Sequence, residues 1–166
     1  RRAPGRPVSG RRLAAVVAVD AAAWAAVGVG AGYLAHRLPA RFLDRERWLW
    51  RERAWERGGR FYADVARIRR WKGLLPEAGA AFAGGFDKRR LRGRGAADLE
   101  RFAVETRRAE LAHWLGVLPA PAFVALNPPP LAPFMAVYPL VANLPCIAAQ
   151  RYNRIRLRRV AARLRR

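Results

Sequence analysis

Apolar residues gather in three long blocks, and most of the charged residues lie between and around them. The first block covers residues 13–34, where Asp20 is the one charged residue. At 22 residues, it would extend about 30 Å as an α-helix, which matches the apolar core of a bilayer. Two shorter blocks, residues 111–126 and 131–149, are separated by an Asn-Pro-Pro-Pro turn at 127–130. This pattern predicts an all-α, small integral membrane protein with an N-terminal apolar anchor and a C-terminal transmembrane helical hairpin.

The polar residues divide the chain into five parts. We expect a basic disordered leader at 1–12, an apolar anchor or signal-like segment at 13–34, an amphipathic helical region at 35–104, a motif helix with the hairpin at 105–149, and a basic tail at 150–166. A basic leader before an apolar run is also typical of a signal peptide. The run is longer than a usual signal core, which favours an uncleaved anchor, but spanning, re-entrant and cleaved forms all stay open.

Residues 41–57 alternate charged side chains with bulky aromatic ones. The pattern predicts one or two amphipathic helices in which Trp48 and Trp55, seven residues apart, share a face. Tryptophan with arginine suits an interfacial helix, because the rings lie at headgroup depth and the guanidinium groups meet lipid phosphates. An ordinary helix packed on a soluble subdomain is the alternative. A second helical stripe is expected over residues 60–72, after the Gly58-Gly59 pair.

A glycine-rich stretch, residues 77–97, separates these helices from the motif helix. It carries the basic run 88–92, the segment best suited to contact an anion, although the spacing of a phosphate-binding loop is absent. Asp98 is expected to cap the N-terminus of the helix that follows.

The distribution of arginine predicts the orientation in the membrane. A hairpin within residues 105–149 places the amphipathic region and the basic tail on one side, which should be the cytoplasmic face of a bacterial cell membrane. An anchor that spans the membrane at residues 13–34 would leave the five arginines of the leader on the other side. Either that segment is re-entrant or lies flat, or it is a signal peptide, or its leader loses to the stronger downstream charge.

Composition excludes several classes of protein. Lys and Arg total 33 against 12 Asp and Glu, a net charge of +21, while 52% of the residues are hydrophobic. A soluble nucleic-acid-binding protein would rarely be both this basic and this apolar, so nucleic acid is not expected as a partner. The single cysteine, Cys146, excludes an intrachain disulfide, and two histidines, His36 and His113, are too few for a His-rich metal cluster. We expect no bound metal or cofactor and predict no particular oligomeric state.

The densest group of polar residues is the stretch Glu105-Thr-Arg-Arg-Ala-Glu-Leu-Ala-His-Trp114, at the start of an apolar block. In a helix, Thr106, Glu110 and His113 recur at i, i+4 and i+7 and share one face. Polar groups where a helix enters lipid are costly and are therefore functional candidates. His113 could act as a general base, because an unperturbed imidazole titrates near pH 6.5. Glu110 would then orient the ring, Thr106 would be a hydrogen-bond partner or a nucleophile, and Arg108 would face an anionic group.

A structural interpretation of the same stretch stays open. Glu105 with Arg108, and Arg107 with Glu110, have the i,i+3 spacing of helix ion pairs. In that case His113 is a polar residue satisfied at the headgroup boundary.

A second polar group follows the last apolar block: Gln150, Arg151, Tyr152, Asn153 and Arg154. This group contains a wider variety of polar side chains than the run of basic residues that commonly follows a membrane span. The hairpin brings it to the same membrane face as residues 105–113, so the two groups are predicted to form one site. Ser9 is the only serine, which argues against a serine hydrolase, and Leu118 stands where an HxxxxD acyltransferase motif needs aspartate.

The motifs ETRRAELAHW and NLPCIAAQRYNRIRL resemble the glycosyl-4,4'-diaponeurosporenoate acyltransferase family of staphyloxanthin-type carotenoid biosynthesis. Upstream, the segment around Glu56, Gly59 and Phe61 resembles the family pattern E-xx-G-x-F, and Trp71-Lys72 resembles its WK pair. The resemblance covers about residues 45–158. It implies transfer of a fatty acyl group onto a sugar hydroxyl of a glycosylated C30 carotenoid acid.

We therefore predict a membrane acyltransferase that moves a fatty acyl group from a thioester, such as acyl-CoA, to a glycosylated carotenoid or similar glycolipid. His113, Glu110 and Thr106 are the candidate catalytic residues. The candidate substrate-binding residues come from the motifs on both sides of the hairpin: Glu105, Arg108, Trp71, Lys72, Gln150, Arg151, Tyr152, Asn153 and Arg154. Arginines at 88–92, or Arg151 and Arg154, would hold the donor phosphates. The alternative is a non-catalytic membrane protein that binds anionic lipid headgroups or scaffolds enzymes of lipid synthesis.

Overall fold

The computed structural model describes residues 10–75 and 95–166, and within these ranges every regular element is helical. The elements in chain order are α1 (Gly10–Arg37), α2 (Ala40–Asp44), η1 (Trp48–Trp50), η2 (Ala54–Gly59), η3 (Phe61–Val65), α3 (Ile68–Trp71), η4 (Lys72–Leu74), α4 (Ala96–Val117), α5 (Ala120–Leu126) and α6 (Ala132–Leu164). The predicted all-α class is confirmed.

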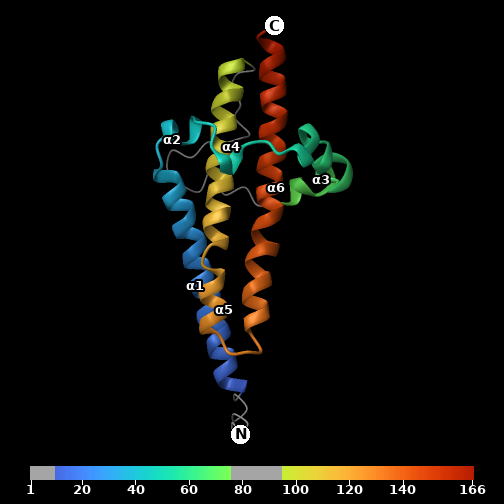
Figure 1. Ribbon diagram of the computed structural model, residues 1–166. Coiled ribbons are helices and arrows are strands. Elements are labelled where there is room, and N and C mark those ends of the chain that lie inside the picture. Colours follow the sequence, from blue (N-terminus) through green and yellow to red (C-terminus); the bar gives the residue numbers. More distant parts are fainter. Residues whose placement is uncertain (1–9, 76–94) are drawn as a thin grey trace.

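The long helices form an elongated bundle (Figure 1). α1 and α6 run in one direction and the α4–α5 pair runs in the other, so α1 begins and α6 ends at opposite ends of the bundle. Pro119 separates α4 from α5, as expected of a residue that has no backbone N–H to continue a helix. Pro139 and Pro145 lie inside α6, which nevertheless continues past both. The predicted hairpin is therefore present, with α5 as a short continuation of α4.

Three helical stretches of the described chain are long and apolar enough to cross a membrane: α1, the α4–α5 stretch Asp98–Leu126, and α6. In α1 the buried residues are Asp20, Trp24, Ala31 and Ala35, which lie on one face, while Val19 and other apolar residues are exposed. An apolar outer surface of this kind suits contact with lipid. The segment 13–34 belongs to one continuous helix that contacts α4, as expected of a spanning anchor.

Residues 38–75 form a short-helix segment that differs from the prediction. The one or two amphipathic helices expected over 41–57 are replaced by α2, η1 and η2, with extended residues such as Arg47 and Arg53 between them. The stripe expected over 60–72 is broken at Arg67, whose φ is 47°. Gly58 and Gly59 have φ of 63° and 86°, values that favour glycine, and η2 ends at this pair.

Between residues 43 and 51, the breaks coincide with hydrogen bonds from distant arginines. Carbonyl oxygens of the segment accept hydrogen bonds from three buried guanidinium groups instead of continuing a helix: Arg107 donates to Leu43 and Asp44, Arg151 to Leu49 and Arg51, and Arg154 to Trp50. Hydrophobic periodicity carries no information about such bonds, because the donors lie at least 63 residues away in the chain.

The short-helix segment packs on α6 through a small apolar core. Tyr62 and Ile68 are buried against Ala149, Tyr152 and Ile155 of α6. Figure 1 shows α2 beside α1 and α3 beside α6, so the segment passes across the bundle. The segment lies at the same height along the bundle as the contact between residues 105–114 of α4 and residues 150–154 of α6.

The N-terminus of α4 differs from the prediction in one detail. Asp98 is not the N-cap: α4 begins at Ala96, Gly95 occupies the cap, and Asp98 lies in the first turn. The cap was misplaced because a first-turn aspartate also favours the helix N-terminus through the helix dipole. The basic run 88–92 lies outside the described residues.

Candidate active site between α4 and α6

Two glutamates and two arginines meet where α4 and α6 face the short-helix segment. Arg151 binds Glu56 through two nitrogens, with Nε to Oε1 at 2.8 Å and Nη2 to Oε2 at 2.9 Å. Its Nη1 donates to Oε1 of Glu110 at 2.8 Å. Nη1 of Arg154 lies 2.6 Å from Oε2 of Glu110. Both glutamates are fully buried, and Arg154 is 2% exposed. These four residues are called the ion cluster, and they confirm that the two predicted polar groups form one assembly.

The pKa of Glu56 is held below its usual value. Burial raises it, but hydrogen bonds from Arg151, from the Tyr62 hydroxyl at 2.6 Å and from the Arg53 backbone N–H at 2.5 Å outweigh the burial. Burial and the neighbouring Glu56 raise the pKa of Tyr62, so its hydroxyl keeps the proton that it donates. Glu56 is therefore an ionised carboxylate at neutral pH.

The ion cluster is balanced in charge, with two carboxylates against two guanidinium groups. Buried ions are tolerated when they are paired and hydrogen-bonded, whereas removal of one partner leaves an uncompensated charge that costs about 3–5 kcal/mol. The cluster joins α4, α6 and η2. The geometry therefore gives Glu110, Arg151 and Arg154 a clear role in holding these elements together.

One turn farther along α4, His113 faces Asn143 of α6. His113 Nδ1 lies 2.9 Å from Asn143 Oδ1. The amide nitrogen of Asn143 donates to the carbonyl oxygen of Pro139 at 2.8 Å. Gly116 makes room for the amide, because a Cβ there would lie 3.0 Å from Asn143 Oδ1. The site thus contains an imidazole whose orientation is set by an amide on the facing helix.

Thr106 forms a hydrogen bond within α4, whereas Arg108 contacts both α4 and the end of α1. Thr106 is fully buried, and its hydroxyl donates to the carbonyl oxygen of Ala103 at 2.6 Å. The predicted i,i+3 pair of Arg107 with Glu110 does not form, because Arg107 donates to backbone carbonyls and Glu110 pairs with arginines of α6. Arg108 pairs with Glu105 at 3.1 Å, which confirms the other predicted i,i+3 ion pair. Its Nη1 also donates to carbonyl oxygens at the C-terminal end of α1: Ala35, His36 and Leu38. Arg108 thereby supplies donors to backbone carbonyls at the end of α1, where few backbone N–H groups are available.

The WK pair contacts the second motif. Lys72 Nζ lies 3.3 Å from Asn153 Oδ1 and 5.5 Å from the centre of the Tyr152 ring. Trp71 packs against the apolar core that contains Tyr152. Gln150 is buried. Trp71 and Lys72 therefore lie against the side of α6 that presents Tyr152 and Asn153.

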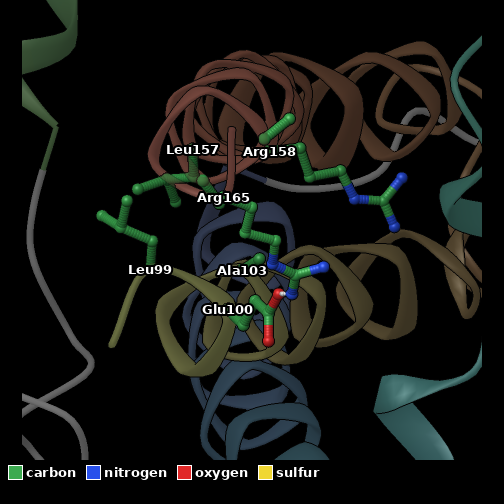
Figure 2. A pocket seen from close by; sticks show the side chains of 8 residues that line it. Leu99, Glu100, Ala103, Leu157, Arg158 and Arg165 are labelled. Atoms are coloured by element: carbon green, nitrogen blue, oxygen red, sulfur yellow. Dashed lines mark ion pairs between the residues drawn. The ribbon is translucent and has the colours of Figure 1, made fainter. Parts of the chain in front are cut away.

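A cavity lies away from His113, between the N-terminal end of α4 and the C-terminal end of α6 (Figure 2). Its volume is about 180 Å³, and its walls include Leu99, Ala103, Leu157 and Ala161. Arg165 pairs with Glu100 at its edge. Ten residues of helix separate His113 from Ala103, about 15 Å.

Sequence reasoning did not assign three residues of this site: Glu56, Asn143 and Gly116. Glu56 and Asn143 lie within motifs that resemble family patterns, which was the available signal. Nothing in the local pattern identifies Gly116, since its contact is with a residue of the opposite helix. Across residues 10–75 and 95–166, no group of three or more His, Cys, Asp or Glu is placed to hold a metal ion.

Comparison with known proteins identifies relatives. Residues 45–163 match the family model for glycosyl-4,4'-diaponeurosporenoate acyltransferase. A protein of that name from Staphylococcus haemolyticus (strain JCSC1435) is 32% identical over 140 residues, 84% of this chain and 81% of the relative. Another, from Staphylococcus aureus (strain bovine RF122 / ET3-1), is 30% identical over 135 residues, 81% of each chain. No solved structure matches the chain. The chain belongs to the glycosyl-4,4'-diaponeurosporenoate acyltransferase family.

Proposed function

We propose that this protein is a membrane acyltransferase that moves a fatty acyl group from a thioester donor to a sugar hydroxyl of a glycosylated carotenoid or similar glycolipid. Family membership supports the reaction class, since the relatives are named as acyltransferases. The observation that carries the mechanism is the 2.9 Å contact between His113 and Asn143. It places an oriented imidazole where α4 passes from its polar part into its apolar part.

The hydrogen bonds of Asn143 define the state of the imidazole. Its nitrogen donates to Pro139, so its oxygen faces His113 as an acceptor. In the neutral ring, Nδ1 must then carry the hydrogen, and the lone pair is on Nε2. This assignment follows from the hydrogen-bond network. An imidazole fixed in this tautomer can accept a proton through Nε2, as a general base must.

In the proposed step, Nε2 of His113 takes the proton of the sugar hydroxyl as its oxygen attacks the thioester carbonyl carbon. A new C–O bond forms and the C–S bond breaks. The departing thiolate receives the proton from the imidazolium, which returns the ring to its neutral state. The products are an ester and a free thiol, so atoms and charge balance without a metal or redox cofactor.

The position of the site suits substrates of different solubility. His113 lies at the start of the apolar part of α4, while the ion cluster and the short-helix segment lie on its polar side. A lipid-linked acceptor can approach from the bilayer, and a soluble donor can approach from the basic side. We assign that side to the cytoplasm of a bacterial cell because it carries most of the arginines.

Lipid mass spectrometry tests the proposal in cells that make the glycosylated C30 carotenoid acid. Wild type is expected to produce a lipid heavier by one fatty acyl group, and His113→Ala is expected to lose at least 100-fold of it, the scale of general-base catalysis. His36→Ala is the matched control, since His36 is the other histidine and lies at the end of α1. Protein levels and thermal unfolding establish that both variants fold.

The same experiment separates the non-catalytic alternative. If the protein only binds anionic lipid or scaffolds other enzymes, His113→Ala keeps the acylated lipid, while neutralisation of the tail arginines abolishes it. That pattern would contradict the proposed function. Glu110→Gln alone does not distinguish the two, because it also disrupts the ion cluster.

A further inference from the structure

The C-terminal part of α6 extends far beyond its apolar part. Residues 132–149 are the apolar stretch, and the 15 residues from 150 to 164 add about 22 Å of helix. The headgroup region adds only about 5–8 Å to each side of the apolar core. Residues from Arg159 onward begin about 15 Å beyond the apolar stretch, which is farther than the headgroup region extends from the apolar core.

Three arginines share a face of this extension. Arg159 and Arg163 are four residues apart on α6, Arg166 follows just beyond the end of the helix at Leu164, and all three are exposed and line one hollow. Like charges at this spacing repel one another. Arg158 and Arg165 each have an acidic partner, Glu46 and Glu100, but among the described residues the other three have none. This face therefore carries a concentrated positive charge that an anionic ligand would neutralise.

An apolar cavity adjoins the arginine face. The cavity of about 180 Å³ seen in Figure 2 is walled by Leu99, Ala103, Leu157 and Ala161 and edged by Arg158 and Arg165. A neighbouring hollow of about 310 Å³ is lined by Arg159, Ala162, Arg163 and Arg166. The two share Ala162. Apolar walls and guanidinium groups side by side suit a ring system that carries phosphates.

We propose that this tip of α4 and α6 binds the nucleotide of acyl-CoA, with the base in the apolar cavity and the phosphates on Arg159, Arg163 and Arg166. The inference rests on the proposed function and supplies its donor site. The distance of these arginines from the apolar stretch favours a soluble ligand over lipid headgroups. A carrier protein would need the arginines but not a ring-sized apolar cavity beside them, so the geometry favours the nucleotide.

The distance to His113 fits this donor. Arg159, the nearest of the three arginines, lies 16 residues along α6 from Asn143, the partner of His113, about 24 Å from backbone to backbone. About thirteen bonds join the sulfur of CoA to its nearest phosphorus, and at the rise of an extended chain, roughly 3.5 Å per three bonds, they span ~15 Å. With the ~6 Å reach of the Arg159 side chain, a phosphate held by Arg159 lets the thioester approach the level of His113, whereas a phosphate held by Arg163, four residues farther along, does not.

Calorimetric titration of CoA tests the site directly, with the full chain in nanodiscs of phosphatidylcholine, which is neutral. Arg159→Gln/Arg163→Gln is expected to weaken CoA binding at least 10-fold. Arg60→Gln/Arg70→Gln is the matched control, because it removes the same charge from exposed positions of the short-helix segment and should change binding less than 2-fold. Thermal unfolding establishes that both double variants fold.

Kinetics provide a second readout. The Arg159/Arg163 variant should raise KM for acyl-CoA at least 10-fold with kcat within 2-fold, since these residues bind the donor but do not touch the reacting atoms. Adenosine 3′,5′-bisphosphate should compete with acyl-CoA on wild-type protein, a measurement that needs no variant. Absence of CoA binding to wild type, an equal loss in the control pair, or lack of competition would each overturn the inference.

The two proposals fail in different ways. If CoA binds as expected but no glycosylated lipid is acylated, the nucleotide site stands and the proposed function falls. If a carrier-protein thioester supports acyl transfer while CoA does not bind, the proposed function stands and the nucleotide site falls.

Discussion

At the scale of single residues, the proposed chemistry depends on which nitrogen of His113 holds the hydrogen. Asn143 is itself oriented by Pro139 and accommodated by Gly116, so the orientation of the ring rests on three contacts between α4 and α6 or within α6. Asn143 is a positioning residue, because it acts through His113.

Replacement of Asn143 should therefore lower kcat more than it changes KM. Asn143→Leu removes the acceptor at Nδ1 and is expected to reduce kcat about 10- to 100-fold, within the contribution of general-base catalysis. Asn143→Asp keeps an acceptor and should retain more activity than Asn143→Leu. Gly116→Ala, which crowds the amide, should give an intermediate loss.

The tautomer can be observed without an activity assay. In the NMR spectrum of protein labelled with 15N-histidine, only two histidines contribute signals. The variant His36→Gln shows which signals belong to His113. We expect hydrogen on Nδ1 of His113 in wild type and a mixture of tautomers in Asn143→Leu. A wild-type ring with its hydrogen on Nε2 would contradict the positioning role.

At the scale of elements, the ion cluster explains why a chain segment without long helices is ordered against the bundle. Glu56 from η2 meets Arg151 from α6, and that arginine also binds Glu110 of α4. Arg151 and Arg154 in turn donate to backbone carbonyls of the short-helix segment. Acidic pH should therefore loosen this segment before the bundle.

The direction of this pH dependence follows from the lowered pKa of Glu56. Its pKa is lowered in the folded protein relative to the ordinary value of 4.5, so it contributes stability that is present above about pH 4.5 and is lost as the pH falls through the lower folded value. Hydrogen exchange of residues 48–62, corrected for the intrinsic pH dependence, should accelerate across this window.

Two variants test the assignment to Glu56. Glu56→Gln should exchange quickly at neutral pH and lose the acid dependence, because Arg151 then lacks a charged partner. Glu46→Gln is the control: it breaks a more exposed pair with Arg158, and such pairs contribute only about 0–1 kcal/mol. Equal acid dependence in Glu56→Gln and wild type would show that another group is responsible.

At the scale of the whole molecule, the direction of α1 has consequences for topology. α1 begins at the end of the bundle opposite to the C-terminal end of α6. If all three helical stretches cross the membrane, Arg12 and Arg163 lie on different sides. With the tail on the proposed cytoplasmic side, Arg11 and Arg12 are then on the outer side, contrary to the usual bias, because the arginines of the short-helix segment and of the tail outnumber them.

Cysteine labelling tests this topology in a Cys146→Ala background, which removes the single native thiol. With a membrane-impermeant maleimide, Arg163→Cys should react only in inverted vesicles and Arg12→Cys only in right-side-out vesicles. Arg60→Cys reports the side of the short-helix segment and should follow Arg163→Cys. Labelling of residues 12 and 163 from the same side would show that α1 does not span.

The all-α class, the three apolar stretches, the hairpin and the polar groups at 105–114 and 150–154 were predictable from the sequence. These features depend on local quantities: the length of an apolar run, the helical spacing of Thr106, Glu110 and His113, and the proline-rich turn between two runs. The meeting of the two polar groups was also predictable, because a hairpin brings its two ends to one face. The motifs that resemble the family lie on these same elements.

Only the tertiary structure decided which polar groups pair. Glu110 meets Arg151 and Arg154 from 41 and more residues away, and His113 meets Asn143 across 30 residues. The same distant arginines take the carbonyls of residues 43–51 and break the helices that local periodicity predicts there. Periodicity reports which face of a helix is apolar, but it does not contain the identity of the partner on the facing element, which depends on how the helices pack.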